Sequence, residues 1–164
     1  MPDSCPTWDL TDLYADIGDT TITSDIAACR DAAAALATAW QGKLDAADAT
    51  EMATVITEYE RIIEILGKAA SHAQLEFAAN TTDADIARHH QSIRETGAEI
   101  SSLLLFVELE LARVPQERMD ELVKVPALAH WVPWLRRVRA YAPHRLAPDM
   151  ERMLAERAPS GRGA

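Results

Sequence analysis

Five histidines and two cysteines are the side chains in this chain best suited to hold a metal ion or to attack a substrate. His72 and Glu76 are four residues apart, a spacing at which two side chains of one helix can bind the same ion. Two ligands do not complete a zinc site, and the H-E-x-x-H motif is absent. His89 and His90 are neighbours, so on a helix they diverge by about 100° and do not suit one ion. The sequence therefore predicts no metal site in this chain.

Motifs for covalent catalysis and for phosphate binding are also absent. The sequence has no G-x-S-x-G, no C-x-x-C, no glycine-rich phosphate loop and no dinucleotide fingerprint. Cys5 lies in a polar terminal segment, and Cys29 lies on an apolar stripe. Both are predicted to be inert free thiols in a reducing cytoplasm. No catalytic residue is predicted.

A cationic and aromatic segment near the C-terminal end is the remaining candidate for binding. Its cationic members are Arg136, Arg137, Arg139, His144 and Arg145, and its aromatic members are Trp131, Trp134 and Tyr141. Guanidinium groups can bind a carboxylate ligand in a bidentate manner. They can equally stack on tryptophan at a structural interface. We also expect the segment to dock on the acidic N-terminal arm within the same chain.

Charge is spread unevenly along the chain, which has a net charge of −10. Residues 1–60 hold 12 acidic and 2 basic side chains, whereas residues 130–164 hold 3 acidic and 7 basic ones. A strongly acidic balance argues against nucleic-acid binding. No signal peptide is visible, and the longest apolar run, residues 103–107, is too short to span a bilayer. We therefore expect a cytoplasmic protein with neither nucleic-acid nor membrane partners.

Apolar residues at helical spacing predict that helices position these side chains. A first helix is expected from Thr23 or Ser24 to Gly42. Asp48 and Glu51 form a capping pair for a second helix. Its apolar stripe comprises Met52, Val55, Ile56, Tyr59, Ile62, Ile63, Leu66, Ala70, Ala73 and Phe77. The Asn80-Thr81-Thr82-Asp83 turn then caps a third helix with a heptad stripe at Ile86, Ile93, Ile100 and Val107. The two long segments predict an antiparallel hairpin of about 45 Å.

Shorter elements follow the hairpin, so the fold class is an all-α helical bundle. Pro115 is expected to open a helix that ends near Val125, and Pro126 to open another. Pro133 is expected to bend or restart that helix, and Pro148 to open the last. The domain organisation is an N-terminal arm (1–20), a helical domain (21–158) and a linker or end segment (159–164). In the arm, Trp8, Leu10, Leu13 and Tyr14 are expected to pin it to the core. The apolar run at 103–111 is expected in the core, with an exposed groove as the alternative.

Seven short motifs occur in an order that resembles the N-terminal region of oligoendopeptidase F. They are Trp8-Asp9-Leu10-x-x-Leu13-Tyr14, Tyr59-Glu60, Phe77-Ala78-Ala79-Asn80-Thr81-Thr82-Asp83, Phe106-Val107-Glu108-Leu109-Glu110-Leu111, Trp134-Leu135-Arg136-Arg137, Pro143-His144-Arg145-Leu146 and Glu151-Arg152-Met153-Leu154-Ala155-Glu156. The resemblance covers nearly the whole chain.

The family that the chain resembles consists of thimet-oligopeptidase-like zinc metalloendopeptidases, which are mostly helical and cleave oligopeptides inside a channel. The resemblance implies that zinc and the catalytic glutamate belong to a C-terminal catalytic domain of the same polypeptide. No catalytic or metal residue carries over to this chain, which is expected to hold no cofactor and to be inactive alone. Its implied role is to help wall the substrate channel. A stand-alone helical module that binds a protein or peptide is the alternative, and dimerisation through the hairpin is a third possibility.

Overall fold

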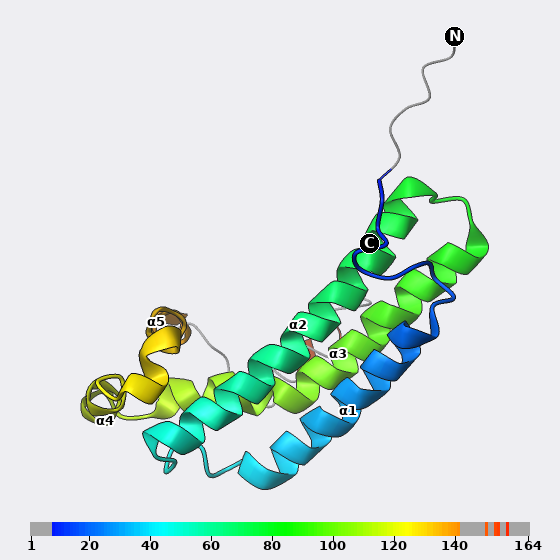
Figure 1. Cartoon of the computed structure of the whole chain (residues 1–164). Coiled ribbons are helices and arrows are strands. Elements are labelled where there is room, and N and C mark those ends of the chain that lie inside the picture. Colours follow the sequence, from blue (N-terminus) through cyan, green and yellow to red (C-terminus); the bar gives the residue numbers. More distant parts are fainter. Residues whose placement is uncertain (1–7, 142–149, 151–152, 155–156, 158–164) are drawn as a thin grey trace.

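The computed structural model describes residues 8–141, 150, 153, 154 and 157. Within them the chain is helical and has no strand, which confirms the predicted all-α class. The elements are α1 (Thr20–Trp40), α2 (Ala49–Ala79), α3 (Ala84–Arg113), α4 (Gln116–Leu122), the 3₁₀ helix η1 (Pro126–Trp131) and α5 (Val132–Tyr141). Three long helices lie side by side, and the three short ones gather at one end (Figure 1). The α2–α3 pair forms the long antiparallel hairpin that the sequence predicts.

Aspartate side chains begin each of the long helices. Asp48 and Glu51 form the predicted capping box at α2, and Asp83 accepts from the first amides of α3. The expected start of the first helix near Thr23 or Ser24 is wrong. The helix begins at Thr20, because the Asp19 carboxylate accepts the amide proton of Thr21 at 2.8 Å.

The main core lies where all three long helices meet the short ones. Its fully buried large members include Leu44, Met52, Ile56, Ile62, Ile100, Leu104, Leu111, Leu128 and Leu135. Within α2 the predicted stripe is wrong at two positions, since Ile63 is 38% exposed and Ala70 is exposed. Ala69 is buried instead of Ala70. The run at 103–111 mostly enters the core, as expected, although Leu103 is 41% exposed.

A second, smaller core anchors the N-terminal arm at the other end of the bundle. It consists of Tyr14, Ile22, Ala69, Ala73 and Ile93. The Tyr14 hydroxyl donates to Asp25 Oδ2 at 2.9 Å, and Lys68 Nζ lies 4.2 Å from the centre of the Tyr14 ring. The expectation that Trp8 helps to pin the arm is wrong, because its side chain is 80% exposed. Tyr14 therefore fastens the arm, with Leu13 half-buried beside it.

Two long-range clamps hold the connection between α1 and α2. The Glu110 carboxylate accepts the amide protons of Gly42 at 2.7 Å and Leu44 at 3.1 Å. At the other end of the connection, the Arg118 guanidinium donates to the carbonyls of Ala46 and Ala47. Gly42 has a φ of 81°, the left-handed region that glycine adopts at low cost.

Prolines divide the short elements as expected, with two differences in detail. Pro115 caps α4, which ends at Leu122 rather than near Val125. Pro126 opens a 3₁₀ helix, and Pro133 sits in the first turn of α5. Most of the helix expected after Pro148 lies outside the described residues, as does Pro143, but Met150, Met153, Leu154 and Arg157 are helical. No helix of the described residues has the length and apolarity needed to cross a membrane.

Candidate functional site

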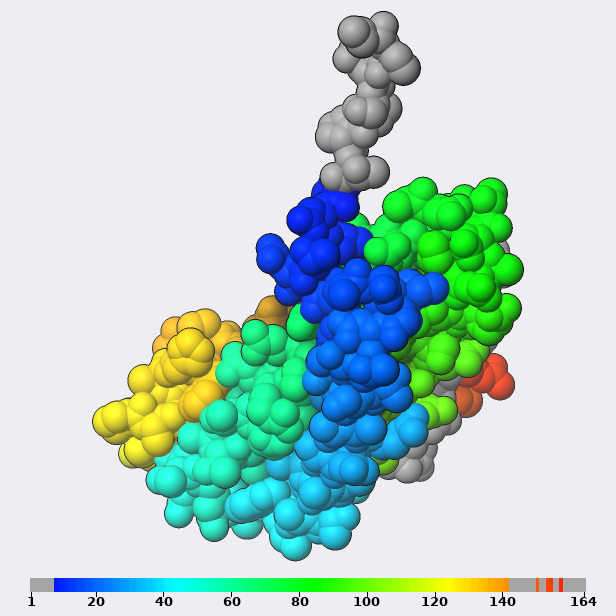
Figure 2. All heavy atoms as spheres, turned by 45° about the vertical axis from the view of Figure 1, so that its right-hand side comes forward, coloured from blue at the N-terminus to red at the C-terminus, as the bar shows by residue number. Residues whose placement is uncertain are grey.

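A groove with a volume of about 540 Å³ lies between the first half of α2 and the η1–α5 segment. It is lined by Ile56, Tyr59, Glu60, Ile63, Glu64, His130, Trp131, Pro133 and Trp134. Figure 2 shows the short helices, in yellow and orange, standing out beside α2 at one end of the molecule. Contacts of η1 with α2 and of α5 with α3 hold this projection in place. The groove is within the size range of small-molecule and side-chain binding sites.

Aromatic rings form the walls of this groove, which we call the aromatic groove. The centres of the Tyr59 and Trp134 rings are 5.7 Å apart, and those of His130 and Trp131 are 5.4 Å apart at nearly a right angle. The Trp131 indole Nε1 donates to Glu60 Oε2 at 3.1 Å, which fixes that ring against α2. Both tryptophans are only half-buried. Part of each indole surface is therefore accessible to a ligand.

The charged side chains of the aromatic groove are two carboxylates. Glu60 and Glu64 are one helical turn apart on α2, and both are exposed. In the described part of the chain neither belongs to an ion pair, whereas nearby Arg61 pairs with Glu58 at 2.7 Å. Among the described residues, no lysine or arginine lines the groove. Its described lining therefore combines apolar walls with two exposed carboxyl side chains.

The predicted cationic set divides into members with different surroundings. Arg139 is half-buried and donates to the carbonyls of Leu111 and Val114 and to Gln116 Oε1. Arg136 and Arg137 are exposed, and no hydrogen bond or ion pair involves them within the described residues. The remaining members, His144 and Arg145, lie outside the described residues.

Two of these arginines share a smaller pocket of about 340 Å³ beside α4. Arg136 and Arg139 line it together with Gln116 and Asp120. Arg139 is already bonded to the α3–α4 junction, and Asp120 accepts a hydrogen bond from Gln116 at 2.8 Å. A bidentate site for a carboxylate ligand stays a prediction.

For the described part of the cationic segment, the expected docking on the acidic arm is wrong, whereas His144 and Arg145 lie outside the described residues. Figure 1 shows α5 and the arm at opposite ends of the bundle. The physical reason is the Tyr14 anchor, which fixes the arm beside α1 and the far end of α2, while Leu135 and Val138 bury α5 in the main core.

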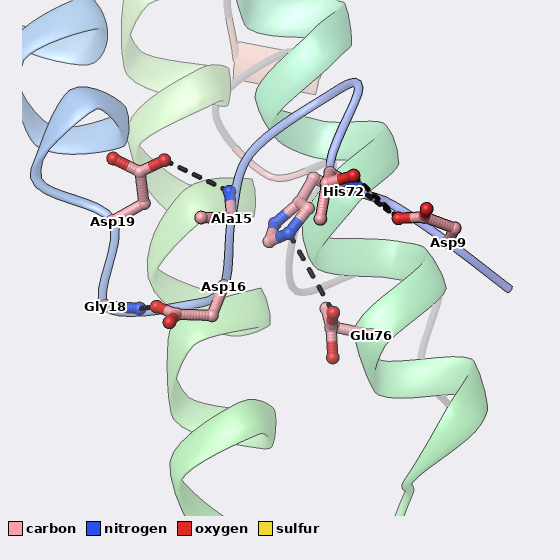
Figure 3. Close-up of polar contacts among 8 residues, drawn as sticks. Asp9, Ala15, Asp16, Gly18, Asp19, His72 and Glu76 are labelled. Carbon is pink, nitrogen blue, oxygen red and sulfur yellow. Dashed lines mark hydrogen bonds and ion pairs between the residues drawn. The ribbon is translucent and has the colours of Figure 1, made fainter. Parts of the chain in front are cut away.

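His72 is fully buried where the arm crosses α2 (Figure 3). Its ring meets the edge of Tyr14, with ring centres 5.5 Å apart, and its Nε2 lies 3.9 Å from Glu76 Oε1. Neither ring nitrogen has a hydrogen-bond partner within the described residues. In the adjacent loop, Asp16 and Asp19 accept the amide protons of Gly18 and Ala15. The arm aspartates are thus engaged with backbone and do not complete a metal site around His72.

Two more histidines lie nearby on α3. Burial lowers the pKa of His89, and the proximity of His72 lowers it further. Burial also lowers the pKa of His90, whose ring stacks on Phe77 with centres 4.8 Å apart. Both histidines are half-buried, as expected for boundary residues. These histidines therefore resist protonation in the folded chain.

The described residues offer neither a metal site nor an activated nucleophile, and Cys5 lies outside them. Among residues 8–141 and the few described beyond them, no three side chains of histidine, cysteine, aspartate or glutamate come together in a way that could hold a metal ion. Burial raises the pKa of the Cys29 thiol, which keeps it protonated and unreactive. The residues described do not fit zinc, and no step of hydrolysis can be assigned to them.

Sequence reasoning placed Trp131 and Trp134 with the arginines and missed their acidic partners. The partners are Glu60 and Glu64, which belong to a helix more than 60 residues earlier in the chain. A local signal existed, since Tyr59-Glu60 and Ile63-Glu64 repeat an apolar–acidic pair at a spacing of four, which puts both pairs on one face of a helix.

Comparison with known proteins adds one finding on ancestry. A family model described as oligopeptidase F, for the N-terminal region of these enzymes, matches residues 110–164. The resemblance predicted from the ordered motifs is thereby confirmed for the last third of the chain. No curated protein and no solved structure matches the chain.

Proposed function

We propose that this chain is the N-terminal helical region of an oligoendopeptidase F-like zinc metalloendopeptidase. The match of residues 110–164 to the oligopeptidase F family carries the proposal. That range includes the end of α3, all of α4, η1 and α5, and therefore one wall of the aromatic groove. The role proposed for the chain is to help wall the substrate channel and to support the catalytic domain of the same polypeptide.

Catalysis in this scheme belongs to the rest of the enzyme. Among the described side chains no three could hold zinc, and the sequence has no H-E-x-x-H motif. Zinc and the general base would come from the C-terminal catalytic domain, as the resemblance implies. The substrate would be an oligopeptide, and the low cysteine content favours a cytoplasmic location.

Exposed apolar side chains support a role as part of a larger assembly. Met150, Met153 and Leu154 are all nearly half exposed on the C-terminal helical residues. Val125 and Tyr141 are further exposed apolar side chains at the ends of η1 and α5. Exposed large apolar groups that are close in sequence often mark contacts with another domain.

The proposal is tested by measuring zinc binding and peptide cleavage separately for residues 1–164 and for a longer protein that contains them. Residues 1–164 are expressed alone and, separately, joined to the sequence that follows in the same reading frame. We expect the joined protein to bind one zinc ion and to cleave a quenched fluorescent oligopeptide, and the isolated chain to do neither. Stoichiometric zinc with hydrolysis by the isolated chain would refute the proposal.

The alternative, a helical module that binds a protein or peptide without catalysis, has its own support in the aromatic groove. The reading frame distinguishes the two functions. A continuation that lacks an H-E-x-x-H motif would favour the module, whereas one that contains it would favour the peptidase.

A further inference from the structure

We propose that the aromatic groove binds the side chain of an arginine in an extended peptide. The proposal does not depend on the peptidase assignment, because it concerns only residues of this chain and can be measured on this chain. Its basis is the combination of three features in one groove: an apolar floor, accessible aromatic walls and an acidic rim that has no lysine or arginine beside it among the described lining residues.

The floor of the groove suits the methylene stem of a long basic side chain. Ile63 is the one member of the α2 stripe that is both large and exposed, at 38%. Ile56 lies deeper in the same groove and is fully buried. Arginine and lysine commonly lay their aliphatic stems on such surfaces and keep the charged head at the rim.

The walls suit a planar cation. The half-buried indoles of Trp131 and Trp134 offer accessible π faces, and a cation over an indole face is attracted by the ring quadrupole. The Trp131 indole N–H donates to Glu60, which increases the electron density of the ring and strengthens that attraction. A guanidinium group stacks on such rings more effectively than an ammonium group.

The rim supplies the charge complementarity that selects a cation over an apolar group. Glu60 uses one carboxylate oxygen for the indole N–H, and no described residue donates a hydrogen bond to its other oxygen. Glu64 stands one turn further along α2. Since the described lining of the groove includes no lysine or arginine, a ligand that brings a positive charge complements these carboxylates.

The experiment uses the four tryptophans as separate reporters. The ¹⁵N-labelled chain is titrated with a capped peptide that has one central arginine among glycines and alanines, and the indole N–H signals are followed by NMR. We expect the signals of Trp131 and Trp134 to move. Those of Trp8, which is exposed in the arm, and Trp40, at the end of α1, should stay in place.

A citrulline peptide is the matched probe, because citrulline has nearly the shape of arginine and no charge. We expect it to bind about tenfold more weakly. The double substitution Glu60→Gln with Glu64→Gln should weaken the binding of the arginine peptide by about threefold to tenfold. The control Asp31→Asn with Glu117→Gln removes the same total charge from exposed positions elsewhere and should leave binding unchanged.

Three results would overturn the proposal. They are equal binding of the citrulline peptide, equal weakening by the control substitutions, and no movement of the Trp131 and Trp134 signals at millimolar peptide. In each case the groove would be an apolar contact surface for another domain. The zinc and hydrolysis measurements above are independent of these outcomes, so the two proposals can fail separately.

Discussion

Replacing Arg139 with methionine should destabilise the bundle, whereas the same change at Arg136 or Arg137 should not. The three arginines lie on the same helix, so each substitution removes one positive charge and leaves a long apolar stem. Within the described residues, Arg139 is the one of the three that forms hydrogen bonds to other elements. Its guanidinium reaches the C-terminal carbonyls of α3, which have no partner within the helix itself.

The expected magnitude follows from the contacts that are lost. Arg139 makes one long hydrogen bond to Leu111 O, at 3.4 Å, and short ones to Val114 O and Gln116 Oε1. A hydrogen bond to a charged group contributes roughly 1.5–3 kcal/mol when buried. Because Arg139 is only half-buried, hydrogen bonds to water can replace part of this contribution. We therefore expect the free energy of unfolding to fall by about 1–2 kcal/mol. For a chain of this length, that corresponds to a fall in the melting temperature of about 2–8 °C.

Thermal and urea unfolding followed by circular dichroism at 222 nm measures the effect. Arg136→Met and Arg137→Met should change the free energy of unfolding by less than about 0.5 kcal/mol, as is usual for exposed positions without contacts. The free energy of unfolding of Arg139→Lys should lie between those of the unsubstituted chain and Arg139→Met, since an ammonium group cannot reproduce the planar fork of a guanidinium. Equal melting temperatures for all three methionine variants would refute the assignment of Arg139 as the link between α5 and α3.

Four further predictions concern two glycines, a helix cap and a histidine. Gly67→Ala should raise the free energy of unfolding by about 1 kcal/mol in urea titrations, because a Cβ there meets open space inside a helix, and Gly42→Ala should lower it by about 1 kcal/mol because of its positive φ. Asp48→Ala should cost about 1 kcal/mol through loss of the capping box, and an unchanged urea midpoint would contradict this. Since folding lowers the pKa of His89, the unfolded chain binds more protons below pH 6.5, the ordinary histidine pKa, and stability should decline as the pH falls through that value. His89→Gln should flatten this decline in melts at pH 7.5 and 5.5, and an unchanged decline would contradict this account.

Local signals allowed much of the helical framework to be predicted. A cap depends on residues within one turn, so Asp48, Glu51 and Asp83 could be identified without knowledge of the fold. The heptad stripe of α3 was predictable for the same reason, since its spacing places it on one face in any packing. The errors at Ile63 and Ala70 arise because which edge of a stripe is buried depends on the neighbouring helix.

Features that depend on distant partners could not be predicted. Trp8 and Tyr14 are equally plausible anchors by composition, but only Tyr14 meets α1 and α2. The arginines were predicted as one group. Which of them is half-buried and hydrogen-bonded, and which are exposed, depends on where α5 packs. The carboxylates of the aromatic groove were missed because they come from another helix.

The two clamps on the connection between α1 and α2 have a consequence for the order of folding. The amides of Gly42 and Leu44 find their acceptor in Glu110, 68 and 66 positions further along the chain. Closing contacts over such a separation is entropically costly and belongs to a late step. In hydrogen exchange, these two amides of the α1–α2 connection should therefore be protected only while the end of α3 is docked, so they report on the detachment of α3 from the bundle rather than on local loop motion.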